Sequence, residues 1–171
     1  MILCLSPASL AFPFKVVLGS SISRLLRLAT GCLVGSQSSI QARFDGTCII
    51  GNYVWINPES YFDARHLIIE DYVGWGLRAK VLGSTDSSFP VDIPIVQNDL
   101  EIKPVRIDAR ADVGTNAFIL PGVTIERGSI GGVGSVATKD VDSFSIVLES
   151  PAKFLKWPEG YIAEEDYENN E

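Results

Sequence analysis

Basic residues are scarce in this chain, and their scarcity excludes one broad class of function. Fourteen lysine and arginine residues stand against 21 aspartate and glutamate residues, which gives a net charge of −7. The nearest approach to a basic cluster is Arg24 with Arg27, which suits a solvated surface. Because binding to nucleic acid requires clustered basic side chains that neutralise phosphates, we expect no nucleic-acid partner.

Cysteine and long hydrophobic runs are also in short supply. Cys4, Cys32 and Cys48 have neither paired spacing nor an even count, so we expect buried thiols and not a disulfide framework or a zinc site. The apolar start is interrupted by prolines and a lysine, and no positive charge precedes it as in a secretory signal. No run reaches about 18 uninterrupted apolar residues, the length that crosses a membrane. We therefore expect a cytoplasmic protein without a membrane span.

What the chain has in abundance is a repeat of six residues. Apolar residues recur at this interval along most of the 171-residue chain, and one long loop interrupts them. Most of these positions are followed by Gly, Asp, Asn or Glu, which allow a strand to turn a corner, and a small or β-branched residue usually comes three places after that. The repeated positions are Val34, Ile40, Ile50, Ile56, Phe62, Ile69, Trp75, Val81, Ile107, Val113, Ile119, Ile125, Gly131 and Ala137.

Each six-residue unit predicts one short strand whose first residue points inward. Three such strands make one triangular turn of a solenoid, and coils of about 18 residues stack at about 4.8 Å by backbone pairing. The chain has room for about five coils. We divide it into an N-terminal cap segment (1–32), a β-helix domain (33–157) with a loop insertion (82–106), and an acidic tail (158–171) that we expect to be solvated.

The N-terminal cap segment contains a helix-like pattern. Residues 20–30 place Ile22, Leu25, Leu26 and Ala29 on one helical face behind a serine, which predicts a short amphipathic helix. The apolar residues before it could cap the solenoid or rest on a membrane. Capping is the favoured interpretation, because an open coil end exposes unpaired strand edges.

Three motifs carry a resemblance to a known family: ILPGVTI at 119–125, TKD at 138–140 and PAK at 151–153. With them, residues 30–157 resemble the hexapeptide-repeat acyltransferases, in particular the acetyl-CoA-dependent sugar O-acetyltransferases of the maltose, galactoside and nodulation type. The resemblance implies a left-handed parallel β-helix, a homotrimer, and active sites between neighbouring subunits. It also implies transfer of the acetyl group of acetyl-CoA to a hydroxyl or amino group of a sugar or sugar nucleotide.

The resemblance further implies roles for individual residues. Asn57 falls where the sugar acetyltransferases keep a substrate-contacting asparagine, although asparagine is also common at corners. In the loop, Phe89 and Asp92 are candidate contacts to the acceptor. A lysine suits a coenzyme A site because it can pair with the phosphates. The positions where the family contacts coenzyme A are Thr115, Gly134, Ser135, Thr138, Lys139 and Lys156.

The chain departs from the family at the catalytic base. The family places a histidine in a loop stretch that reads LGSxHxxxP, and here the stretch reads LGSTDSSFP, with Asp86 at the histidine position. A histidine with a pKa near ~6.5 suits removal of a proton from a sugar hydroxyl at neutral pH. Three alternatives remain open. Asp86 could serve as the base if burial between subunits raises its pKa, His66 could reach the site from about one coil away, or the scaffold could persist without acetyl transfer.

Two further classes follow from the resemblance. A non-catalytic trimeric β-helix, acting as a binding or assembly module, is the alternative to an enzyme. The γ-type carbonic anhydrases use the same helix but bind zinc through three histidines from two subunits. Because this chain has one histidine, we exclude that class and expect no metal.

A second departure from the hexapeptide-repeat acyltransferases is Asp112, because that family usually has an aromatic residue at this position.

Overall fold

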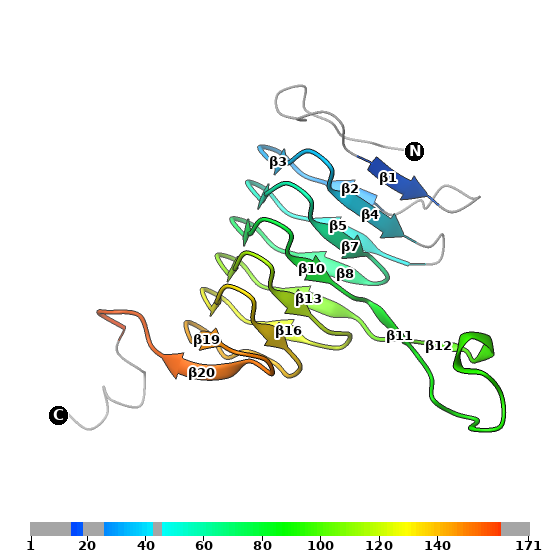
Figure 1. Cartoon of the computed structure of the whole chain (residues 1–171). Helices are drawn as coiled ribbons and strands as arrows, with labels where there is room; N and C mark the ends of the chain where they lie inside the picture. The colour runs from blue at the N-terminus through cyan, green and yellow to red at the C-terminus, as the bar shows by residue number, and fades with distance from the viewer. Residues whose placement is uncertain (1–14, 19–25, 43–45, 162–171) are drawn as a thin grey trace.

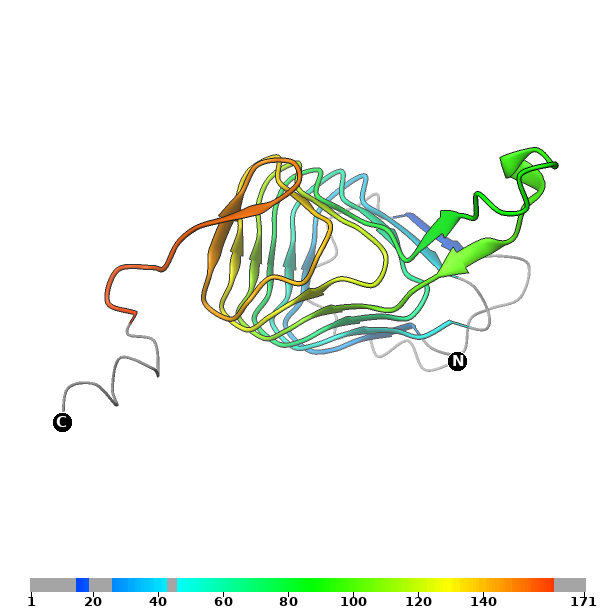
Figure 2. The same cartoon turned by 90° about the horizontal axis from the view of Figure 1, so that it is seen from below.

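Short parallel strands form a triangular solenoid in this chain (Figures 1 and 2). The structure is a computed structural model that describes residues 15–18, 26–42 and 46–161. Each turn of the chain adds one strand to each of three flat faces, and strands stacked on the same face pair with one another. The solenoid predicted from the six-residue repeat is therefore confirmed.

We name the three faces A, B and C in the order in which the chain follows them from β3 onward. Face A ends in an antiparallel strand, β20, that covers the last coil. Its strands are β3 (Leu33–Val34), β6 (Trp55–Ile56), β9 (Gly74–Trp75), β14 (Asp112–Val113), β17 (Ile130–Gly131), β19 (Ile146–Leu148) and β20 (Lys153–Lys156).

Faces B and C are parallel throughout. The strands of face B are β1 (Lys15–Leu18), β4 (Ser39–Ala42), β7 (Tyr61–Asp63), β10 (Lys80–Val81), β15 (Phe118–Ile119) and β18 (Val136–Ala137). The strands of face C are β2 (Leu26–Leu28), β5 (Cys48–Ile50), β8 (Leu67–Ile69), β13 (Val105–Ile107) and β16 (Thr124–Ile125), followed by a bridge from Ile125 to Val141.

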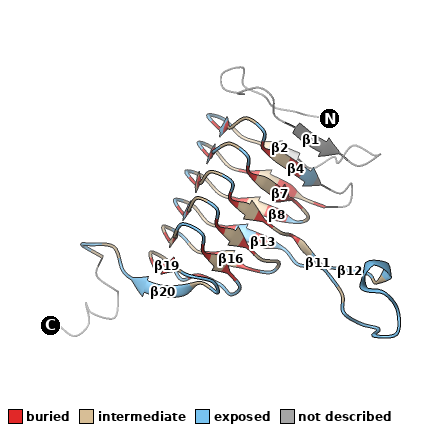
Figure 3. Ribbon diagram, viewed as in Figure 1, coloured by how far each residue is buried: buried red, intermediate tan, exposed pale blue. Residues whose placement is uncertain are grey.

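The repeated apolar residues form the core, as the repeat predicts. All fourteen positions are buried, and they stack in columns inside the coils (Figure 3). The rings of Phe62 and Trp75, from neighbouring coils, lie 4.7 Å apart between centroids. The small or β-branched residues of the pattern are buried as well: Val54, Val73, Ala79, Ala111, Ala117, Val123 and Ser129. The interior is therefore filled by two side chains from each six-residue unit.

Most described corners of the solenoid are tight turns with one residue in the left-handed conformation. At one corner, the Ala79 amide donates to the Gly76 carbonyl (3.2 Å), and Arg78 has φ 58°, as at the third residue of a type II turn. This conformation costs a non-glycine residue about 1 kcal/mol. The cost is offset because the Arg78 amide also donates to the Pro58 carbonyl of the neighbouring coil (3.1 Å). Equivalent positions are Gln37, Tyr53, Glu59, Tyr72, Arg110 and Asn116.

The structure corrects the interpretation of the N-terminal segment. The helix predicted over residues 20–30 is wrong at its C-terminal end, because Leu26–Leu28 form β2; residues 20–25 lie outside the described residues. Leu26 pairs in parallel with Cys48, so this stretch already belongs to a coil. With β1 also paired to β4, the solenoid begins before residue 33 and has about six turns, one more than predicted.

The predicted loop insertion is a projecting hairpin. The chain leaves face B after Val81 and rejoins the solenoid at Val105 on face C. Between them, β11 (Ser84–Asp86) and β12 (Leu100–Ile102) pair antiparallel, and a short 3₁₀ turn, Ile95–Gln97, lies near the tip. Figure 2 shows the hairpin extending from one corner of the triangle.

Removal of one inward side chain tests the core. Ile107 is fully buried and stacks between Ile69 and Ile125 on face C. We expect Ile107→Ala to lower the free energy of unfolding by about 2–5 kcal/mol, because a cavity would remain in a column that the flanking coils hold open. Urea denaturation monitors the change. Leu33→Ala, at an outward position, is the control and should cost less than about 1 kcal/mol. Equal effects would contradict this account of the core.

Candidate functional site

A hollow of about 430 Å³ lies on face C beside the base of the hairpin. His66 stands at its rim, and the Val105 amide of the strand that returns from the hairpin donates to the His66 carbonyl (3.1 Å). His66 therefore lies in the coil that precedes the return of the hairpin strand, and its side chain is exposed. The lining residues are Thr47, His66, Ile68, Pro104, Val105, Arg106, Gly122 and Thr124.

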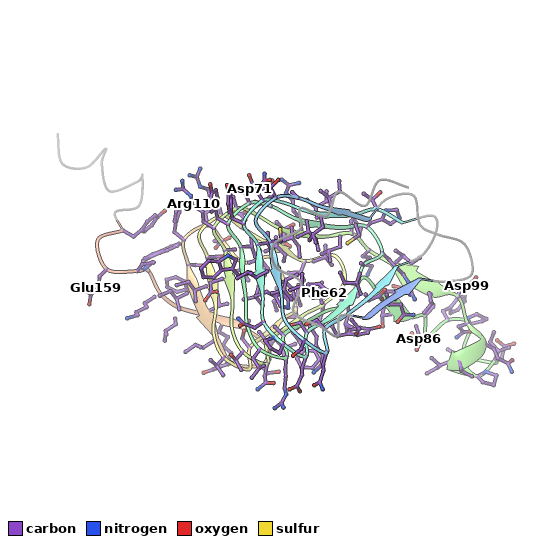
Figure 4. All side chains as sticks on the ribbon, turned by 90° about the horizontal axis from the view of Figure 1, so that it is seen from above. Phe62, Asp71, Asp86, Asp99, Arg110 and Glu159 are labelled. Atoms are coloured by element: carbon purple, nitrogen blue, oxygen red, sulfur yellow. The ribbon has the colours of Figure 1, made fainter. Side chains whose placement is uncertain are left out.

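Asp86, at the position of the family histidine, lies on the hairpin. It ends β11, its backbone pairs with Leu100, and its side chain is exposed. Figure 4 shows Asp86 outside the coils, near Asp99 and away from the interior position of Phe62. Within the described chain no hydrogen bond or ion pair engages its carboxylate. Enclosure of the Asp86 carboxylate therefore requires a bound molecule or a second subunit.

The predicted site residues separate into two groups on different edges of the prism. We call the corners between faces A and B edge AB, and those between faces B and C edge BC. Thr115 and Gly134 stack on edge AB, where the Gly134 amide donates to the Thr115 carbonyl (2.8 Å). Asn57 lies on the same edge, and its side-chain amide donates to the Trp75 carbonyl (3.0 Å), which is a corner role. Ser135, also on this edge, is buried.

The second group lies on edge BC together with the hairpin. Thr138 and Lys139 follow β18 directly and are exposed. The next residue, Asp140, accepts a hydrogen bond from the backbone amide of Thr124, which lines the hollow (2.7 Å). The TKD segment therefore borders the hollow. Lys156 is apart from both groups, at the end of β20 on face A.

The two loop residues predicted to contact an acceptor lie on the outer part of the hairpin. Phe89 is 76% exposed and Asp92 is also exposed. The side chains from residue 88 to residue 97 are all exposed. The hairpin by itself therefore offers contacts but no enclosed space for an acceptor.

One cluster of polar residues escaped the sequence analysis. Asp63 and Arg65 flank the corner after β7, and Ser84 begins β11; the three side chains are joined by hydrogen bonds and an ion pair. Asp63 and Ser84 are 21 residues apart, close to the length of one coil. A search for polar residues separated by one coil length would have found the pair.

An exposed aromatic patch covers part of face A. Tyr53 and Tyr72 stack with ring centroids 5.2 Å apart, and Trp55 beside them is 61% exposed. Together with Val73 and Gly74 they line a shallow hollow of about 350 Å³. This patch lies opposite edge BC, because the third side of a triangle faces the corner between the other two.

The described residues contain neither a cluster of metal ligands nor a helix that could span a membrane. Over residues 15–18, 26–42 and 46–161, no three histidine, cysteine or acidic side chains come together as a metal site would require. In the same ranges, the structure contains no helix with the length and apolarity to cross a bilayer. The thiols of Cys32 and Cys48 are buried, as predicted, and burial raises the pKa of Cys48 to about 12.

Comparison with known proteins identifies the fold class. The hexapeptide-repeat acetyltransferase of Vibrio cholerae has been solved as a complex with acetyl coenzyme A. Its sequence is 26% identical to this one and the TM-score is 0.61; the match covers 74% of this chain and 70% of that chain. AntD of Bacillus cereus, an N-acyltransferase solved with dTDP and coenzyme A, is 19% identical with a TM-score of 0.60, over 81% and 80% of the two chains. The structural neighbours are thus hexapeptide-repeat acetyltransferases, as the motifs predict.

Sequence comparison agrees with the structural neighbours. A putative acetyltransferase of Schizosaccharomyces pombe is 35% identical over 98 residues, which are 57% of this chain and 46% of that protein. No family model matches the chain. The chain spans about half the length of this curated relative and less of others, such as a putative acetyltransferase of Staphylococcus aureus.

Asp112 provides a test of electrostatics on face A. It points outward next to Gly74 and Ile130 of the flanking coils, and desolvation raises the pKa of its carboxyl above 3.8. Because the folded-state pKa exceeds the unfolded value, the ionised form opposes folding at neutral pH, and this cost disappears as pH falls and the carboxyl is protonated. We expect Asp112→Asn to raise the melting temperature at neutral pH.

The gain from Asp112→Asn should shrink as the pH falls through the raised folded-state pKa toward the ordinary carboxyl value of 3.8, because protonation of the folded carboxyl removes the cost of burying its charge. Thermal unfolding followed by circular dichroism across this range measures it. Asp99→Asn, on the exposed hairpin, removes the same charge and should have little effect. A gain that grows at low pH would contradict the assigned direction.

Proposed function

We propose that this chain is an acetyltransferase that uses acetyl-CoA to acetylate a hydroxyl or amino group of a sugar or sugar nucleotide. The carrying observation is the hollow on face C, which lies between the hairpin base and the TKD segment expected to contact coenzyme A. The V. cholerae neighbour with its bound acetyl coenzyme A supports the donor. AntD, with its bound dTDP, supports an acceptor related to sugar nucleotides. Buried thiols such as Cys48 suit a reducing cytoplasm.

A homotrimer accounts for the separation of the candidate residues. Thr115 and Gly134 on edge AB cannot meet Thr138 and Lys139 on edge BC within one chain, because face B lies between them. When edge AB of one subunit faces edge BC of the next, the two groups form one cleft. A cyclic arrangement of this kind repeats one heterologous contact until the ring closes.

In the proposed site the lysines bind the donor and the hairpin delivers the base. Lys139 and Lys156 pair with the phosphates of coenzyme A. Asp86 takes the proton from the acceptor as its oxygen or nitrogen attacks the thioester carbonyl, and the tetrahedral intermediate then collapses to release the thiol of coenzyme A. His66, at the rim of the hollow, is the alternative base.

Donor binding and transfer can be tested together. We expect saturating acetyl-CoA to raise the melting temperature, because a ligand that binds only the folded state stabilises it, by about 2.7 kcal/mol at 100 times Kd. Thiol release with a panel of hydroxyl and amino sugars then identifies the acceptor class. If acetyl-CoA does not change the melting temperature, the alternative of a non-catalytic trimeric β-helix, which the sequence also allows, describes the chain better.

Variants distinguish the two candidate bases. Asp86→Ala should lower kcat by roughly 10²–10⁴-fold, the range for loss of a general base, whereas His66→Ala should leave most activity. Asp99→Ala, on the same hairpin, is the control. Asp86→His should increase transfer to hydroxyl acceptors, because imidazole titrates near neutral pH. Equal turnover of the wild type and Asp86→Ala would eliminate Asp86 as the base.

The assembly is tested by sedimentation equilibrium. The expected species has three times the 18.6 kDa mass of the chain. A wild-type protein that remains monomeric across a concentration series would leave the two edges unconnected and refute the shared cleft.

A further inference from the structure

The hairpin leaves the solenoid at a buried ionic cluster. The Ser84 hydroxyl donates to Asp63 Oδ2 (2.6 Å) and accepts a hydrogen bond from Arg65 Nη1. Arg65 Nε lies 3.2 Å from Asp63 Oδ1. The side chains of Arg65 and Asp63 are only 12% and 7% exposed. Ser84, the first residue of β11, is therefore bound to both members of an ion pair in the coil before it.

The backbone at Gly83, the residue before Ser84, is closely packed against the coil before it. A Cβ atom added to Gly83 would lie 2.6 Å from the Asp63 carbonyl oxygen and 2.9 Å from that of Arg65. Only glycine allows so close an approach of two backbones. The Gly83 carbonyl in turn accepts the amide of Lys103 (3.1 Å), which closes the base of the hairpin. Both strands of the hairpin thus start from one anchored point.

The cluster of Asp63, Arg65 and Ser84 contributes little net stability for the hydration that its charged groups lose. Charged groups lose hydration when they are buried, and apolar side chains of similar volume would often be as stable. In the other ion pairs within the described residues, both partners are at least 24% exposed. A buried pair of charges does, however, specify direction, because hydrogen bonds impose geometry that apolar contacts do not.

The direction of Ser84 determines the direction of Asp86. Side chains two residues apart on a strand point to the same side, so Ser84 and Asp86 share one side of β11. If the Ser84 side chain is held against Asp63 and Arg65, Asp86 faces the same way. A hairpin that rotated about its base would change the direction in which Asp86 points.

We propose that Asp63, Arg65 and Ser84 form a clamp that sets the orientation of the hairpin and thereby positions Asp86. The three are positioning residues, because they act through Asp86. The structural part, orientation of the hairpin, is independent of the proposed function. The positioning of a base rests on the proposed function, and separate measurements test the two parts.

Amide hydrogen exchange tests the clamp directly in the full chain. Ser84→Ala keeps the Asp63–Arg65 ion pair, so the solenoid should fold with a nearly unchanged melting temperature. Exchange in β11 and β12 should become about tenfold faster or more, because the two charge-assisted hydrogen bonds of the Ser84 hydroxyl no longer oppose opening. Ser84→Thr, which retains the hydroxyl, should restore protection.

The matched control is Ser129→Ala. Ser129 is buried, whereas Ser84 is partly buried, and the Ser129 hydroxyl donates a bond of the same length, 2.6 Å, to the Glu126 carbonyl at a corner without a hairpin. It should leave exchange in the hairpin unchanged. Hairpin exchange that is equal in Ser84→Ala and wild type, or equally accelerated in Ser129→Ala, overturns the clamp.

Kinetics tests whether the clamp positions the base. In an active preparation, Ser84→Ala should lower kcat by on the order of tenfold to a hundredfold, leave KM for acetyl-CoA unchanged, and be rescued by Ser84→Thr. Faster hairpin exchange with unchanged kcat would overturn the positioning role. If wild type transfers no acetyl group, the proposed function fails, while the exchange result still decides whether the clamp exists.

Discussion

Backbone pairing between successive coils is the interaction on which the rest of this structure depends. Most strands have only two or three residues, and none would be stable alone. Each gains stability because its amides and carbonyls pair with the coil before and the coil after, as β9 does between β6 and β14. Pairing of this kind requires coils of equal shape. It explains why residues as large as Tyr72 and Arg78 adopt left-handed conformations at the corners.

The same constraint decides where extra chain can be added. An insertion within a strand would shift every pair in the ladder, whereas a corner can open without disturbing the faces. The hairpin uses this freedom: it leaves after β10 and returns at β13, yet β10 still pairs with β7 and β13 with β8. Most candidate functional residues consequently lie on edges or on the hairpin, and Lys156 on face A is an exception. The interior is occupied by the apolar columns, and the faces are occupied by the ladders.

Particular residues show how far the sequence could predict this arrangement. The inward positions, such as Phe62 and Ile107, follow from the repeat, because a coil of constant length brings the same position inward each time. The stretch around Leu26 is short and fits both a helical and a strand pattern, and pairing with Cys48 selected the strand. The motifs indicated the class of protein, and the structural neighbours agree. Asp86 was correctly placed in an inserted loop, but the hairpin direction was not predictable.

The sequence by itself determined the cross-section and the columns of the solenoid, because both arise from local spacing repeated along the chain. Only the tertiary structure decided which polar residues meet. Ser84 binds Asp63 and Arg65 because stacking brings residues about one coil apart into contact. Thr115 and Lys139 lie on different edges because face B separates them. Contacts between coils depend on how the corners align in space, and this alignment is a property of the stack as a whole.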